Sequence, residues 1–166
     1  MIRDRIWTNL VNSKFKCIYI GYLLNDFQKT SFAINIFLTI LSLTSVSAWV
    51  IWNIVPWLWS ILIATSNILL AIKPLLAYDK RIKELAERLT VLEEVQFEYE
   101  KLWYQYETNT VDEKVAFNKF FELYDRQIKS LRTSGEIMLN ESKKLKLKSD
   151  RDTDIYIRNN YNVIIA

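Results

Sequence analysis

The sequence of 166 residues contains no histidine, one cysteine (Cys17) and two glycines (Gly21 and Gly135). Without histidine there is no imidazole to act as general base or metal ligand, and the Ser/His and Cys/His pairs of nucleophilic enzymes are excluded. A single cysteine excludes a disulfide framework within the chain and a zinc site built from thiolates. Two isolated glycines do not make a phosphate-binding loop. These absences exclude most familiar catalytic and metal sites.

The acidic residues do not supply a replacement. Asp150, Asp152 and Asp154 have the spacing that opens a calcium-binding loop. However, Ile155 stands where that loop needs glycine, and Tyr161 where it needs glutamate. The adjacent acids at 93–94 and 112–113 are expected on solvated helix faces. We therefore expect no catalytic residue, no metal site and no cofactor, and we expect that the chain is not an enzyme.

Charged side chains are missing from one long segment, Thr30 to Ile72, which is bounded by Lys29 and Lys73. A helix that spans a bilayer needs about 20 mainly apolar residues. The segment is long enough for two spans, at about 31–52 and 56–73, and Pro56 suits the first turn of the second helix. We expect a transmembrane hairpin over residues 30–74. The alternative is a buried helical hairpin of a soluble domain, but a domain this small can hardly surround two such helices.

The expected turn of this hairpin is rich in tryptophan and carries no charge. Indole rings favour the boundary between water and lipid, where the ring is buried and its N–H stays hydrated. We expect four residues to form such an interface belt: Trp49, Trp52, Trp57 and Trp59.

Basic residues flank the hairpin on both sides but do not occur in its turn. By the positive-inside rule, both termini are then cytoplasmic. The net charge of +3 comes from residues 1–29, because residues 73–166 hold equal numbers of acidic and basic residues. A neutral cytoplasmic region attracts phosphates weakly, so no specific nucleic-acid binding is expected. A cleaved signal peptide is not expected either, because the apolar run begins only at Thr30 and is long.

Polar residues within the expected spans follow helical spacing. One stripe lies on the first span and another on the second, so that each helix has one face of small or polar residues. Such stripes either pack helices together or, in an oligomer, line a water-filled path. The residues concerned are Asn35, Thr39, Ser42, Ser60 and Asn67.

Residues 1–29 have apolar side chains at helical spacing, from Trp7 through Val11, Phe15 and Ile18 to Tyr22. This pattern predicts an N-terminal amphipathic helix that lies on the inner leaflet of the membrane. An equally good alternative is a helix folded onto the cytoplasmic domain.

Residues 75–140 show two consecutive heptad patterns, which predict a cytoplasmic helical hairpin. The second pattern starts after a capping box at Thr110–Glu113 and runs through Phe117, Phe121 and Tyr124. Beyond it, residues 141–166 are expected to form a partly ordered tail, which packs on a neighbour through Ile155, Ile157, Tyr161 and Ile164. We assign an oligomer interface to the first pattern, at Leu85, Leu89, Leu92, Gln96, Tyr99 and Trp103.

Roughly residues 30–107 resemble the SLATT group of small bacterial two-transmembrane proteins: the hairpin with Pro56 to Lys73 as its second span, followed by KPLLAYDKRIKELAERL and EYEKLWYQY. It is also similar to the small membrane accessory proteins of type VI CRISPR systems. The resemblance implies a bacterial inner-membrane protein of anti-phage defence that oligomerises into a pore. It also implies a cytoplasmic fold that is HEPN-like at most. Arg151 is followed by Tyr156 where HEPN nucleases carry histidine, so RNA cleavage is not expected.

The fold expected from the sequence is therefore an all-α membrane protein. The first hypothesis for its function is an oligomeric inner-membrane effector or accessory protein whose spans form a pore that permeabilises or depolarises the membrane. The second is a membrane-anchored scaffold that recruits a soluble partner protein, for example of a defence system. The expected partners are the lipid bilayer, other copies of the chain and such a protein.

Overall fold

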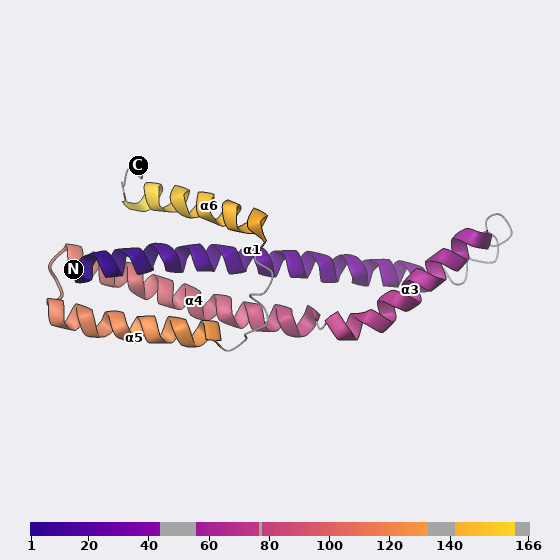
Figure 1. The fold of residues 1–166 in the computed structure, drawn as a ribbon, viewed down its shortest axis with the longest axis horizontal. Helices are drawn as coiled ribbons and strands as arrows, with labels where there is room; N and C mark the ends of the chain where they lie inside the picture. The colour runs from indigo at the N-terminus through magenta and orange to yellow at the C-terminus, as the bar shows by residue number, and fades with distance from the viewer. Residues whose placement is uncertain (44–55, 77, 133–141, 162–166) are drawn as a thin grey trace. The chain divides into compact units, whose positions relative to one another are not determined.

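The computed structural model describes residues 1–43, 56–76, 78–132 and 142–161. Within these ranges the chain forms α-helices and no strands, as the all-α prediction requires. The polypeptide divides into two compact units, Met1–Leu23 with Leu85–Ala166 (unit 1) and Leu24–Glu84 (unit 2). The helices, labelled as in Figure 1, are α1 (Ile2–Leu43), α3 (Pro56–Leu76), α4 (Tyr78–Glu107), α5 (Glu113–Arg132) and α6 (Lys143–Tyr161).

Two of the predicted helix boundaries can be compared with the structure. Helix α3 begins at Pro56, as predicted, because proline at the first helical position loses no hydrogen bond. The capping box was placed wrongly. Helix α5 begins at Glu113, and the carboxylate Oδ2 of Asp112 accepts a hydrogen bond from the backbone N–H of Lys114 at 3.4 Å. Asp112, and not Thr110, therefore caps this helix.

The end of α4 has a left-handed residue. Asn109 has a φ of 53°, and the backbone N–H of Thr110 donates to the carbonyl of Gln105 at 2.9 Å. Asparagine tolerates this conformation better than most residues do, and the turn satisfies a carbonyl that the helix would leave without a partner. The turn allows α5 to return along α4, as the predicted cytoplasmic hairpin requires (Figure 1).

Unit 1 has a core made by four helices. The first turns of α1 contribute Ile2, Ile6 and Leu10, which lie at helical spacing. The other fully enclosed residues come from α4, α5 and α6: Val95, Tyr99, Leu102, Ala116, Phe120, Leu123 and Ile157. Of the two alternatives for residues 1–29, the packing of unit 1 agrees with the second, because the first turns of α1 are folded onto α4, α5 and α6.

The buried faces of α1 and α5 are not the ones that the sequence predicted. In α1 the buried stripe continues from Leu10 to Ser13, Cys17 and Ile20, whereas Trp7 and Val11 are only partly buried at its border. In α5 the predicted seam of Phe117, Phe121 and Tyr124 is exposed, and the face that begins with Ala116 is buried. The buried faces contain small residues, Ser13 in α1 and Ala116 in α5. A search for large apolar side chains overlooks faces of this kind.

The expected tail of residues 141–166 is also corrected, because residues 143–161 form helix α6. Its buried positions are Ser149, Thr153 and Ile157. Both hydroxyls donate to carbonyls four residues earlier, at 2.8 and 2.7 Å, so these polar side chains can be buried without an unpaired group. Ile155, which was expected to pack, is 49% exposed. Ile164 lies outside the described residues.

Helix α6 lies antiparallel to the first half of α1. Tyr161 meets Trp7 with ring centroids 5.3 Å apart, and the ammonium group of Lys14 lies 3.6 Å from the centre of the Tyr156 ring. In the middle of α6, Asp152 accepts a hydrogen bond from the hydroxyl of Tyr22. A hydrogen bond, a cation–ring contact and an aromatic contact therefore hold the second half of α6 against α1.

Unit 2 contains the second half of α1, helix α3 and the first residues of α4. The rings of Phe27 and Tyr78 lie with centroids 5.7 Å apart. Lys73, the first charged residue after the uncharged segment, donates a hydrogen bond to Asn35. These contacts join α1 to α3 and to the start of α4.

Candidate functional site

The most unusual feature of unit 2 is its apolar surface, by which we mean the exposed large apolar side chains of α1 and α3. None of the positions from Thr30 to Ile72 carries a charge. Exposed apolar patches of this kind mark a contact with another protein or with a membrane. The described residues of the apolar surface are Phe32, Ile36, Ile40, Trp57, Ile61, Ile63, Ile68, Leu70 and Ile72.

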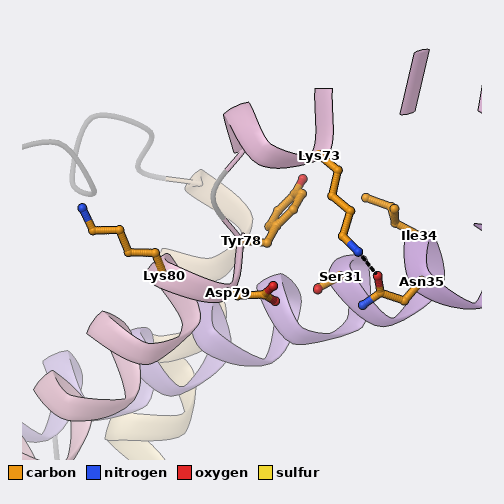
Figure 2. A pocket seen from close by; sticks show the side chains of 7 residues that line it. All are labelled: Ser31, Ile34, Asn35, Lys73, Tyr78, Asp79 and Lys80. Carbon is orange, nitrogen blue, oxygen red and sulfur yellow. Dashed lines mark hydrogen bonds between the residues drawn. The ribbon is translucent and has the colours of Figure 1, made fainter. Parts of the chain in front are cut away.

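A polar pair lies where the uncharged segment ends. The Nζ of Lys73 donates to Oδ1 of Asn35 at 2.7 Å (Figure 2). The ammonium group of Lys73 extends from α3 back toward α1, and the carboxamide of Asn35 receives it. This cross-helix bond fixes the pairing of α3 with α1 at this point, and a hydrogen bond to a charged donor is stronger than a neutral one.

The pair borders a pocket of about 240 Å³. Its lining is completed by two residues of α1, Ser31 and Ile34, and by three residues of α4, Tyr78, Asp79 and Lys80. In Figure 2 the side chain of Lys80 points away from the Asn35–Lys73 pair, whereas the ring of Tyr78 lies close to Lys73. The pocket therefore combines two lysines, a phenol, a carboxylate and a buried serine next to the apolar surface.

The other residues of the predicted polar stripes lie on the same two helices. The hydroxyl of Thr39 donates to the backbone carbonyl of Asn35 at 2.8 Å, within α1. Ser42 is in the last turn of α1, and Ser60 and Asn67 are exposed on α3. The Thr39 bond is local to one helix, whereas Asn35 also forms a hydrogen bond between α1 and α3, to Lys73.

The predicted tryptophan belt is described only in part. Trp57 is 65% exposed in the first turn of α3, and Trp59 lies two residues further along this helix. Trp49 and Trp52 lie outside the described residues, so the grouping of the four rings stays a prediction.

The heptad pattern of α4, which we assigned to an oligomer interface, is covered by the chain itself. Leu85, Leu92 and Tyr99 are at most 1% exposed, and Gln96 is 5% exposed. Leu89 and Trp103 are half-buried, with Trp103 against Trp7 at 4.8 Å between ring centroids. A heptad pattern predicts that a helix face is packed, but it does not say whether the partner is another copy or another part of the same chain. Here the helices of unit 1 cover it, and the fully buried positions have no surface left for a second copy.

Two functional candidates were missed by sequence reasoning. Lys73 was treated only as a flanking charge. Because it directly follows the uncharged segment, a hydrogen-bond partner inside that segment could have been considered. Arg88 is 7% exposed on α4, and its Nη2 has no hydrogen-bond partner within the part of the chain that the structure describes. Its position between Leu85 and Leu92 in the heptad pattern was the available signal.

Among the described helices, no single one contains a stretch that is long and apolar enough to cross a bilayer. One bent pair, Ser60–Lys73 with Tyr78–Glu107, does satisfy the requirements of length and composition and is bent by 47°. The search covered only described residues, and it concerns length and composition alone. Within these same residues, no group of three or more acidic or cysteine side chains could hold a metal ion.

The chain was compared with protein-family models, with curated proteins and with solved structures, and it matched none of them.

Proposed function

We propose that the chain is a bacterial inner-membrane effector or accessory protein that inserts residues 30–73 into the bilayer with both termini cytoplasmic and acts there as an oligomer. The observation that carries this proposal is the apolar surface of unit 2. Burying one large aliphatic side chain away from water is worth about 1.5–3 kcal/mol, so a surface of this size in water is costly. Lipid removes that cost over the whole uncharged segment.

The Asn35–Lys73 bond marks the cytoplasmic end of the inserted segment in this proposal. The long apolar stem of Lys73 lies along the helices while its ammonium group reaches the headgroup level. Asn35 gives that ammonium group a partner inside the hairpin. The pair therefore closes the base of the hairpin and keeps a charge at the boundary.

The oligomer encloses a path for water and ions, and opening this path depolarises the membrane. Asn67 and Ser60 are the lining candidates, because they are exposed on α3. Asn35 already bonds Lys73 within the chain, which leaves it less free to face a path. Polar amides on lipid-exposed positions are costly, whereas on a water-filled path they are favourable. The resemblance to small defence proteins supports anti-phage defence as the setting.

The experiment is release of a self-quenching dye from liposomes that contain the full chain. We expect release that rises steeply with protein density, because several copies must assemble. Asn67→Leu should reduce release, whereas Asn118→Leu, at an exposed position of α5 in unit 1, should not. Unchanged release with Asn67→Leu, together with a monomeric or dimeric particle mass in detergent, would rule out the pore.

A second candidate function is a membrane-anchored scaffold, which one observation favours. Phe117, Phe121 and Tyr124 expose their rings on one face of α5, and the first two have centroids 4.7 Å apart. Exposed aromatic clusters are common at protein interfaces. A scaffold predicts that Phe121→Ser abolishes recovery of a soluble partner, while replacing residues 30–73 by an unrelated hairpin leaves the recovery intact.

A further inference from the structure

Unit 1 has an open groove of about 310 Å³ that is separate from the pocket of unit 2. Helix α1 contributes Lys14, Cys17, Ile18 and Gly21 to its wall, and Tyr156 of α6 closes one side. The remaining lining residues come from α4: Leu89, Glu93, Gln96, Phe97 and Glu100. Its size is at the lower end of the range for sites that hold small molecules.

Gly21 keeps this groove open. It lies in the interior of the 42-residue helix α1, where glycine is less favourable than alanine. A methyl group at this position would meet no atom within 4 Å, and its backbone is helical, with no positive φ. Neither close packing nor backbone conformation therefore explains the glycine. What the missing side chain does provide is free volume in the groove.

Hydrogen-bond acceptors outnumber the cations in the groove. The Oε1 of Glu100 accepts from Nε2 of Gln96 at 2.9 Å and from the hydroxyl of Tyr156. The other amide atom of Gln96, Oε1, is buried and has no partner within the described ranges. The only lysine or arginine among the lining residues is Lys14, whose ammonium group rests on the Tyr156 ring. Glu93 and Glu100 against Lys14 leave a net charge of −1.

The charges of Lys14, Glu93 and Glu100 also act on the thiol of Cys17, which lines the same groove. Burial raises the pKa of the Cys17 thiol to about 11. Lys14 acts in the opposite direction, and Glu93 and Glu100 add to the rise. Cys17 and these three charged residues all line the groove.

We propose that this groove binds a small organic cation, an alkylguanidinium or alkylammonium group with a short apolar stem. The charged group donates to Glu100 and Gln96 Oε1, and Glu93 adds charge complementarity. The stem lies along Ile18 and Leu89, over the open space at Gly21. A buried acceptor without a partner is costly, and an N–H donor from the ligand removes this cost. The site lies wholly in unit 1 and does not depend on the proposed membrane function.

The test is saturation-transfer NMR on the full chain in detergent micelles, with butylguanidinium and butylammonium as probes and with micelles alone as the blank. Butyrate, which has the same stem and the opposite charge, is the matched control ligand. We expect both cations to bind at least about tenfold more tightly than butyrate, which corresponds to one charge-assisted hydrogen bond. Equal binding of the cations and butyrate, or binding of neither cation, would overturn the proposal.

Variants locate the binding. Gly21→Leu fills the groove and should abolish binding, whereas Asn12→Leu, at an exposed position of the same helix, should not. Glu100→Gln keeps the size of the side chain and should weaken cation binding about tenfold. Glu122→Gln removes one exposed negative charge from α5 and should leave binding unchanged. A Gly21→Leu protein that is folded by circular dichroism and still binds the cations as the unaltered protein does would contradict the assignment.

The same cationic chemistry can come from a free molecule or from an arginine side chain of another protein. A blocked Gly-Arg-Gly tripeptide distinguishes these sources. Binding of butylguanidinium without the tripeptide assigns the groove to a free small molecule, because the peptide backbone is then excluded. Tighter binding of the tripeptide assigns it to a protein side chain. In either case Gly21→Leu must remove the binding.

Discussion

Units 1 and 2 place similar apolar side chains in opposite surroundings. In unit 1, Ile6, Leu10 and Leu102 are completely buried in a core of the chain's own helices. In unit 2, Phe32, Ile40 and other residues of the apolar surface are exposed. Both units contain part of helix α1, so the difference does not come from the type of secondary structure. It comes from whether the chain supplies helices to cover the apolar face.

The distribution of charged residues also distinguishes unit 1 from unit 2, and more clearly than the distribution of apolar residues does. The outer faces of unit 1 carry ion pairs such as Lys119–Glu98 at 3.1 Å and Lys129–Asp125 at 2.6 Å. The uncharged segment of unit 2 contains no group that could form one. Surface ion pairs add little stability, but charged faces keep a helix soluble. The comparison teaches that unit 1 covers its apolar side chains with its own helices and carries charge outside, whereas α1 and α3 in unit 2 leave apolar side chains exposed.

The largest effect on this comparison is expected from a cavity in unit 1. Leu102→Ala should lower the free energy of unfolding by about 4 kcal/mol, because a fully buried leucine leaves both lost burial and a cavity. Leu147→Ala is the control, since Leu147 is 70% exposed on α6, and should change it by less than about 0.5 kcal/mol. The measurement is urea unfolding followed by circular dichroism. If the two substitutions lowered the free energy of unfolding equally, burial of Leu102 in the core of unit 1 would not stabilise the fold.

The second prediction concerns the apolar surface. Ile63→Asp should weaken the association of the full chain with liposomes by about 3 kcal/mol, or more than about a hundredfold, because aspartate is costly at the centre of a spanning helix. Ile155→Asp is the control, since Ile155 is similarly exposed but lies in unit 1. The measurement is flotation of the protein with liposomes. If both variants float like the unaltered protein, the apolar surface does not face lipid.

Much of the fold follows from local sequence signals. The start of α3 at Pro56, the long helix of α4 and its hairpin with α5 depend on helix periodicity and on proline, which act over a few residues. Which helices pack against the heptad face of α4 depends on tertiary structure, which local signals do not determine. Two partners can satisfy the same pattern, and here the partner is the chain itself.

The candidate sites depended on weaker signals. Helix α6 was expected to be a tail because its buried face consists of Ser149, Thr153 and Ile157. Such a face is polar in the sequence, and only the intrahelical hydrogen bonds of the two hydroxyls make its burial possible. The Lys73–Asn35 bond joins residues 38 positions apart, and no short-range pattern predicts that pairing. The groove at Gly21 likewise depends on three helices coming together.

A third prediction concerns a polar group inside unit 1. Gln127 is 1% exposed, and its Nε2 has no hydrogen-bond partner among the residues described. Gln127→Leu has a similar volume and removes this buried unpaired donor, so it should raise the free energy of unfolding by about 1 kcal/mol. Asn118→Leu, exposed on the same helix, is the control and should have little effect. A lower urea midpoint for Gln127→Leu would show that Gln127 has a partner in solution.

The smallest expected effect comes from the ion pair between Arg3 and Glu107, whose side chains are 53% and 39% exposed. The Nε of Arg3 donates to Oε1 of Glu107 at 2.6 Å, and this bond lowers the pKa of Glu107 below its usual value of 4.5. Because the folded-state pKa is lowered, the contribution to stability is complete above pH 4.5 and is lost as the pH falls through the folded-state pKa. Arg3→Gln should therefore lower the urea midpoint slightly at pH 7, and this effect should shrink as the pH falls below 4.5. Since Arg3 also lies over the ring of Trp103, at 5.3 Å, a deficit that does not shrink as the pH is lowered would assign the stabilisation to this ring contact and not to Glu107.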